Sequence, residues 1–205
     1  MASIAETSKG MEPAATVEKK EWGIVPVFLA ITLPLYILDQ ITKFWIVDRF
    51  PPPWVDHEEK IVVIEKYFNI VRVHNQGVAF GFGNGSDWAP VVFLFVPIMA
   101  LTLITLGWKK NFFIGTWGKV AVGLLLCGIL GNLTDRLVQG SLLEEMQGAS
   151  LWERLKAGYV VDFLDFTIPL FDYRWPSFNV ADSCICVAAA LLFFSGMKAD
   201  LKKAS

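Results

Sequence analysis

Three acidic residues lie inside or at the ends of long apolar stretches, where a charge is costly. Asp39 stands in "DQITK", Asp135 in "GNLTDR" and Asp182 in "FNVAD". An ionised side chain at the centre of a membrane helix costs at least about 2.5 to 3.5 kcal/mol, so such residues are functional candidates by default. A fourth acid, Asp162 in "GYVVDF", lies ahead of the last apolar stretch. These four carboxylates are the first candidates for chemistry.

Two carboxylates that share one proton can hydrolyse a peptide bond. Like charges a few Å apart raise one pKa sharply, so one acid is ionised while the other keeps its proton. The ionised acid takes a proton from water as it attacks the carbonyl, and the protonated acid supplies one to the substrate. For Asp162 and Asp182 we favour this catalytic role.

For the other acids a structural role is equally open. Asp39 and Lys43 have the i, i+4 spacing of a plain helical ion pair, and Asp135 next to Arg136 would suit a clamp at a helix end. Asp165 is expected to be a solvated or capping residue. Further polar side chains of the same layer could fix the carboxylates or bond a substrate backbone, namely Lys43, Asn75, Asn132, Arg136 and Asn179.

The elements that must position these residues are helices that cross a membrane. With 54% hydrophobic residues and a mean hydropathy of +0.48, the chain is more apolar than an ordinary soluble domain. A helix needs about 20 apolar residues to cross the hydrocarbon core. Four stretches qualify, which predicts four spans at 22–47, 89–108, 113–134 and 175–197.

The lysines and arginines predict the orientation of these spans. Basic residues are enriched in cytoplasmic segments, and lysines precede the first span, join the second to the third and follow the fourth. Both termini are then cytoplasmic, with tails at 1–21 and 198–205 around one membrane domain at 22–197. Asp39, Asp135 and Asp182 fall in the same leaflet whichever way the protein is oriented.

The two loops that face outward carry different signals. Loop 48–88 is rich in Val, Ile, Phe and Tyr and broken by Asn and Gly, which predicts short strands and a small β-sheet. Loop 135–174 offers two capping-box spacings, Ser141 with Glu144 and Ser150 with Glu153. Its segment "SLWERLKAG" is expected to form an interfacial helix on the outer face.

Several other functions are disfavoured. The net charge is only -2 and no basic stripe is present, so nucleic acid is not an expected partner. His57 and His74 lack a second histidine at ligand spacing, which argues against a metal. A proton-coupled transporter should have acidic residues in both leaflets, so that they form a path for protons. Spans two to four have no acidic residue in their inner halves. A noncatalytic scaffold remains an alternative, and it would tolerate Asp→Asn changes.

Five motifs in register with the four spans resemble the signal peptidase II family, the lipoprotein signal peptidases. They are "DQITK", "NQGVAFG", "GNLTDR", "VVDF" and "FNVAD", which begin at Asp39, Asn75, Gly131, Val160 and Phe178. The resemblance implies a bacterial inner-membrane aspartic peptidase without metal or cofactor. It implies cleavage of a prolipoprotein before its diacylglyceryl-cysteine, at the outer leaflet and among membrane lipid. We expect the enzyme to be a monomer.

The resemblance also implies roles for particular residues. Asp162 and Asp182 are the expected catalytic pair. The expected substrate-binding residues are Asn75, Asn132 and Arg136, and the expected supporting residues are Asp39, Lys43, Gly77, Ala79, Phe80, Asp135, Asn179 and Ala181. One departure from the family pattern is the long segment between Arg136 and Asp162, which puts the geometry of the lid over the site in doubt.

Overall fold

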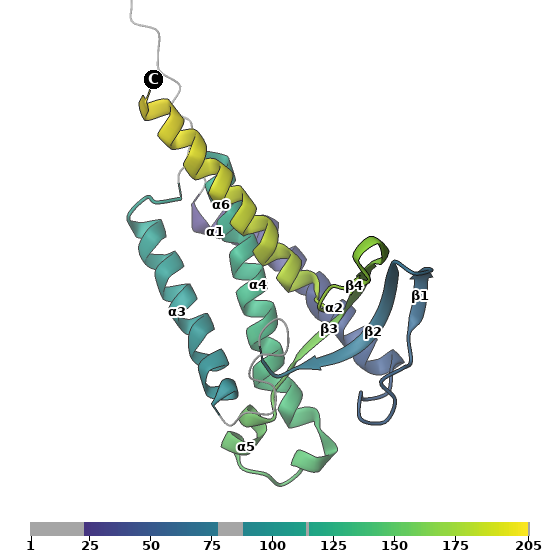
Figure 1. Ribbon diagram of the computed structural model, residues 1–205. Helices are drawn as coiled ribbons and strands as arrows, with labels where there is room; N and C mark the ends of the chain where they lie inside the picture. Colours follow the sequence, from purple (N-terminus) through teal and green to yellow (C-terminus); the bar gives the residue numbers. More distant parts are fainter. Residues whose placement is uncertain (1–22, 78–87, 114, 205) are drawn as a thin grey trace, which may run out of the picture.

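Four apolar helices form the body of the molecule in a computed structural model that describes residues 23–77, 88–113 and 115–204 (Figure 1). The first is continuous through α1 (Ile24–Val27), the π-helical turn η1 (Phe28–Thr32) and α2 (Leu33–Arg49). The others are α3 (Ala89–Lys109), α4 (Gly115–Leu142) and α6 (Val180–Ala204). Three are long and apolar enough to cross a membrane: Ile24–Arg49, Val92–Lys109 and Gly115–Leu142.

The apolar part of α6, Val180–Gly196, is shorter. At about 1.5 Å per residue it covers about 26 Å, close to the thickness of a hydrocarbon core. The chain is a membrane α-helical protein, as predicted. The predicted fourth span begins five residues too early, because residues 175–179 form the end of a loop. Pro176 lacks a backbone donor there, and Phe178 pairs with Leu164 of the sheet.

Small residues on α4 allow its neighbours to approach closely. A Cβ atom added at Gly128 would lie 2.3 Å from Cγ1 of Ile185 on α6, and one at Gly131 would lie 2.6 Å from Oδ2 of Asp39. Close backbone approach through small residues is a general device of membrane helix packing. It places α4 between α2 and α6, with the polar residues of all three on one level.

A four-stranded antiparallel sheet lies at one end of the helices, hereafter the sheet end. Its strands are β1 (Ile61–Ile64), β2 (Phe68–Asn75), β3 (Val160–Ile168) and β4 (Tyr173–Arg174), in the order β1-β2-β3-β4. The small sheet predicted from loop 48–88 is therefore present, although half of its strands come from the second loop.

A buried apolar cluster joins the sheet to α2. Ile46 and Phe50 at the end of α2 pack against Tyr159, Val161 and Phe163 around β3. Since β3 also carries Asp162, this core fixes the strand relative to the spans.

The second loop contains a 3-10 turn, η3 (Glu144–Met146), and the short helix α5 (Leu151–Lys156). Ser150 and Glu153 form the predicted capping box. The other predicted box is wrong: Ser141 lies within α4, which continues to Leu142, and Leu143 precedes η3 without a side-chain cap. Ser141 is inside a helix rather than ahead of one, so it cannot act as an N-cap.

Candidate active site

Asp162 lies in β3 with its carboxylate almost wholly buried, at 1% exposure. Asn75 at the end of β2 donates from Nδ2 to Oδ2 at 2.9 Å, and Asn179 donates from Nδ2 to Oδ1 at 2.7 Å. The antiparallel register places Asn75 opposite Val160, two residues from Asp162. Each carboxylate oxygen therefore has an amide donor supplied by a different segment.

Asp182 lies in the first turn of α6, where the chain makes a reciprocal cap. The Asp182 amide donates to Oδ1 of Asn179 at 2.9 Å, and the Asn179 amide donates to Oδ2 of Asp182 at 3.3 Å. Asn132 of α4 donates from Nδ2 to Oδ1 of Asp182 at 2.7 Å. Asn179 thus caps the N-terminus of α6, and its side-chain amide also donates a hydrogen bond to Asp162.

The two carboxylates, hereafter the aspartate pair, line one cavity of about 590 Å³. Asn75 and residues 175–178 line one side of it, and α6 supplies Ile185, Cys186 and Val187. Cys186 and Val187 are exposed on the α6 surface. A polar centre therefore opens onto an apolar wall of a membrane helix.

Burial is the main cause that raises the pKa of Asp162, to about 7, and the nearby Asp182 carboxylate adds to it. The hydrogen bonds from Asn75 and Asn179 oppose this rise, because they stabilise the ionised form. A carboxylic acid with a pKa near neutrality can hold or release a proton at physiological pH. This property suits acid–base chemistry.

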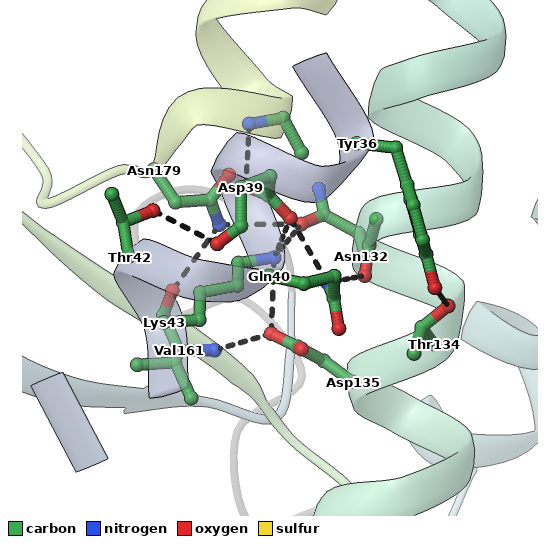
Figure 2. A network of polar contacts seen from close by, with 12 residues as sticks. Tyr36, Asp39, Gln40, Thr42, Lys43, Asn132, Thr134, Asp135, Val161 and Asn179 are labelled. Atoms are coloured by element: carbon green, nitrogen blue, oxygen red, sulfur yellow. Dashed lines mark hydrogen bonds and ion pairs between the residues drawn. The ribbon is translucent and has the colours of Figure 1, made fainter. Parts of the chain in front are cut away.

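A buried lysine connects two further carboxylates, Asp39 and Asp135 (Figure 2). The Nζ atom of Lys43 lies 3.0 Å from Oδ2 of Asp39 and 3.0 Å from Oδ2 of Asp135. It also donates to Oδ1 of Asn132 at 3.0 Å. All three charged side chains are at most 1% exposed. The simple Asp39–Lys43 pair considered from the sequence is present, but it belongs to this larger cluster, the Lys43 triad.

The two carboxylates of the triad each hold the backbone next to one member of the pair. Oδ1 of Asp39 accepts the amide of Ala181 at 2.9 Å, and Oδ2 of Asp135 accepts the amide of Val161 at 3.0 Å. These amides immediately precede Asp182 and Asp162. The triad therefore fixes the strand and the helix that carry the aspartate pair.

Arg136, next along α4, holds the turn that follows Asn75. It donates to the carbonyl of Gly77 at 2.8 Å and to that of Gln76 at 3.4 Å, and its guanidinium lies 4.7 Å from the ring centre of Phe93. The Gly77 amide in turn donates to Oδ1 of Asn75 at 3.0 Å. Arg136 thereby orients the side chain that bonds Asp162, whereas Asp135 bonds Lys43 and Val161.

Two of the sequence-predicted site residues, Ala79 and Phe80, lie outside the described residues. The structure brings the others together at the sheet end: Asp39, Lys43, Asn75, Gly77, Asn132, Asp135, Arg136, Asp162, Asn179, Ala181 and Asp182.

The expectation that Asp165 is a solvated or capping residue is wrong. Its side chain is 2% exposed and accepts bonds from Arg174 Nε at 2.6 Å and from Asn69 Nδ2 at 3.2 Å. The residue braces three strands. Its partners are distant in sequence and carry no local spacing signal, so inspection of the neighbouring residues could not find them.

The sequence analysis did not identify two residues near the site, Gln40 and His74. Gln40 donates to Oδ2 of Asp39 at 3.1 Å and to the carbonyl of Gly131 at 3.3 Å. Its position beside an acid in an apolar stretch could have indicated this role. His74 stacks on Tyr159 with ring centres 3.6 Å apart and accepts a bond from Arg72. Burial, followed by the charge of Arg72, lowers the pKa of His74 to about 3.

A family model for signal peptidase (SPase) II matches residues 31–198. The chain belongs to the signal peptidase II family. A lipoprotein signal peptidase of Geobacter sulfurreducens is 33% identical over 178 residues, which cover 87% of this chain and 96% of that protein. One from Psychromonas ingrahamii is 32% identical over 167 residues, covering 81% and 82%.

A solved structure of a bacterial membrane enzyme superposes with a TM-score of 0.66 at 27% identity, and the match covers 85% of this chain and 89% of the other. A second structure of this kind gives 0.65 at 26% identity, covering 85% and 94%. This signal peptidase II is therefore a multi-pass membrane hydrolase, an aspartic peptidase that removes signal peptides. The family implies a prolipoprotein substrate.

Proposed function

We propose that Asp162 and Asp182 are the catalytic residues, and that they cut a prolipoprotein immediately before its diacylglyceryl-modified cysteine. The main support is that both carboxylates line the same cavity while separate amides hold each of them. Two acids in one buried place cannot both remain ionised at ordinary cost, so the pair holds one proton as a unit.

The shared proton supplies both halves of the reaction. The ionised carboxylate accepts a proton from water as the water oxygen bonds to the scissile carbonyl carbon, and the protonated carboxyl donates to the carbonyl oxygen. One carboxyl then transfers a proton to the amide nitrogen as the C–N bond breaks and the amine leaves. The other carboxylate takes a proton back from a hydroxyl of the tetrahedral intermediate, which becomes the new carboxyl group, so the pair ends with one proton, ready for another cycle.

The remaining residues position the pair and the substrate. Asn75, Asn132 and Arg136 are proposed to contact the substrate backbone; Asn75 lines the cavity, and Asn132 bonds Asp182 directly. The Lys43 triad and Asn179 are proposed to hold the pair in place. The enzyme is proposed to act as a monomer.

The apolar side of the cavity supports a lipid-modified substrate. Cys186 and Val187 belong to the exposed face of α6, so acyl chains in the same leaflet can reach the cavity from the side. The distribution of lysines supports cytoplasmic termini. In that orientation the sheet end faces outward and the aspartate pair lies at the outer leaflet of a bacterial inner membrane.

Two other functions are less well supported. A proton-coupled transporter needs titratable groups along a path through the membrane, yet Asp39, Asp135 and Asp182 gather at the sheet end. A scaffold would need only the Lys43 triad for helix packing, and it gives no reason for a separate pair in an open cavity.

A comparison of three variants tests the proposal. The protein is purified in detergent and given a diacylglyceryl-modified precursor, and the rate of cleavage is measured. Asp162→Asn and Asp182→Asn should each lose at least about 10³-fold in turnover, as expected for removal of a catalytic group. Asp48→Asn is the matched control, since Asp48 is an exposed aspartate in α2 with no contact to the aspartate pair. Near-normal turnover by either of the first two would refute the assignment.

A further inference from the structure

Two adjacent apolar side chains project from the hairpin between β3 and β4. Its tip, residues 168–173, contains the 3-10 turn η4 (Pro169–Phe171). Leu170 is 83% exposed, more than any other large hydrophobic residue in the described part of the chain, and Phe171 is 73% exposed. In water this would be a costly arrangement, because exposed apolar surface is unfavourable in proportion to its area.

The hairpin is held firmly, so the tip has a defined position. Its base is closed by the Trp175 amide, which donates to the Phe166 carbonyl at 2.8 Å. The ion pair between Asp165 and Arg174 braces it from the side. The hairpin is also the segment that joins Asp162 to Asp182 along the chain, so its placement bears directly on the aspartate pair.

The apolar surface of the hairpin is continuous with the surface of a membrane helix. Trp175 at its base and Val187 of α6 line the same cavity, and Val187 is 51% exposed in the apolar part of α6. In Figure 1 the tip turns up from the sheet, toward the side on which α6 runs. The surroundings of an exposed apolar residue on that helix are lipid, and the tip projects on the same side of the sheet (Figure 1).

We propose that Leu170 and Phe171 at the hairpin tip insert as an anchor into the lipid leaflet that holds the aspartate pair, with the exposed carboxylate of Asp172 at the aqueous boundary. Tyr173 and Trp175, 39% and 49% exposed, then lie where amphipathic rings favour the membrane–water boundary. The anchor sets the depth of the cavity relative to the lipid surface, so that the bond next to a lipidated cysteine meets the pair. Only this depth-setting consequence rests on the proposed function.

Immersion is tested by a depth measurement in lipid vesicles. A nitroxide label is attached at Phe171→Cys in the full chain, with Cys186→Ser to remove the exposed native thiol. The control label is at Val55→Cys, since Val55 is 69% exposed but is followed by Asp56, His57 and Glu58. We expect the label at 171 to be relaxed by dissolved oxygen and shielded from a water-soluble nickel chelate, and the label at 55 to show the reverse.

Two results would overturn the proposal. Equal access of the chelate to positions 171 and 55 would place the tip in water. Shielding of position 171 from oxygen and chelate alike would mean that protein, such as a second copy, covers it. Neither result depends on cleavage, so this test stands even if Asp162→Asn proves active and the proposed catalytic pair fails.

The depth-setting role is tested by kinetics in the same vesicles. Leu170→Asn with Phe171→Asn should raise KM for a lipid-modified precursor by roughly fivefold or more while kcat changes by less than about twofold. Val55→Asn should change neither constant. In detergent, where no leaflet defines a depth, the effect on KM should shrink. An unchanged KM in vesicles would exclude the role of the anchor in substrate encounter.

Discussion

Lys43 and Asp135 belong to different membrane helices, yet Nζ of the lysine lies 3.0 Å from Oδ2 of the aspartate, with both side chains about 1% exposed. Asp39 completes the triad at the same distance. Each aspartate also accepts the backbone amide that precedes one member of the aspartate pair. A single ammonium group therefore links the two segments on which the proposed chemistry depends.

Replacing that ammonium group should weaken the fold and the activity together. Lys43→Met leaves two buried carboxylates without a counter-charge, and breaking a buried ion pair in this way costs about 3 to 5 kcal/mol. We expect a clear drop in the melting temperature measured in detergent, accompanied by loss of cleavage. Lys60→Met, at an exposed position, is the control. An unchanged melting temperature for Lys43→Met would contradict the role assigned to the triad.

Removal of the Asn75 side chain should shift the pH dependence of cleavage. The bond from Asn75 lowers the pKa of Asp162 against the rise caused by burial and by Asp182. In Asn75→Ala the pKa therefore moves further upward, and the limb of the pH–rate profile near pH 7 should move upward with it. The measurement is kcat/KM as a function of pH. A limb that stays in place, or moves to lower pH, would show that Asn75 does not act on Asp162 through this bond.

Asp162→Asn should make the melting temperature less dependent on pH while it abolishes activity. The pKa of Asp162 is raised from 3.8 to about 7 in the folded protein. As pH rises through this window the unfolded chain loses its proton first, so the native state loses stability, and the loss is complete above about pH 7. Asparagine does not ionise, so the variant avoids this loss of stability. Melting temperatures at pH 5 and pH 8 should therefore show a larger advantage of the variant at pH 8, by roughly 2 to 4 °C per kcal/mol.

The control for this stability test is Asp48→Asn, at an exposed position of α2, which should show no such pH dependence. A variant at position 162 whose melting temperature does not gain on that of the wild type between pH 5 and pH 8 would mean that the carboxylate is better accommodated than its burial indicates.

Gly131→Ala should disturb the triad by crowding alone. The added Cβ would lie 2.6 Å from Oδ2 of Asp39 and 3.0 Å from Cβ of Ala181, so the oxygen that pairs with Lys43 must shift. We expect destabilisation of about 1 to 3 kcal/mol and reduced cleavage. Gly196→Ala is the matched change, because nothing lies within 4 Å of its added Cβ. Equal melting temperatures for the two variants would show that the helices can relax around position 131.

The position of the acids at one end of the bundle was predictable from the sequence. Each apolar stretch of about 20 residues must cross the membrane, so successive spans alternate in direction. The positions of Asp39, Asp135 and Asp182 within their spans therefore predict that all three lie at the same depth in the membrane. Asp162 is expected near that depth because its loop leads into the last span. This argument needs only span order, and errors of a few residues in the span ends do not affect it.

Contacts between distant segments were not predictable in the same way. Asp165 has the exposed-looking context of a loop acid, yet Asn69 and Arg174 close over it once the strands pair. Ser141 fits a capping spacing, but α4 continues past it. Asn179 was expected to support the pair, but the sequence did not show how. Its cap on α6 and its bond to Asp162 are contacts of the folded chain, and the second depends on the position of β3. For Asp165 and Asn179 the deciding contacts are tertiary, and for Ser141 the deciding feature is the length of α4.

The reciprocal cap between Asn179 and Asp182 has a consequence for biosynthesis. Asp182 reaches its partners only after the last transmembrane segment has formed its helix and packed against the first. There, Asp39 accepts a hydrogen bond from the Ala181 amide. A nascent chain that has inserted three segments therefore lacks one member of the aspartate pair. The proposed catalytic site is assembled only once the fourth segment has entered the membrane.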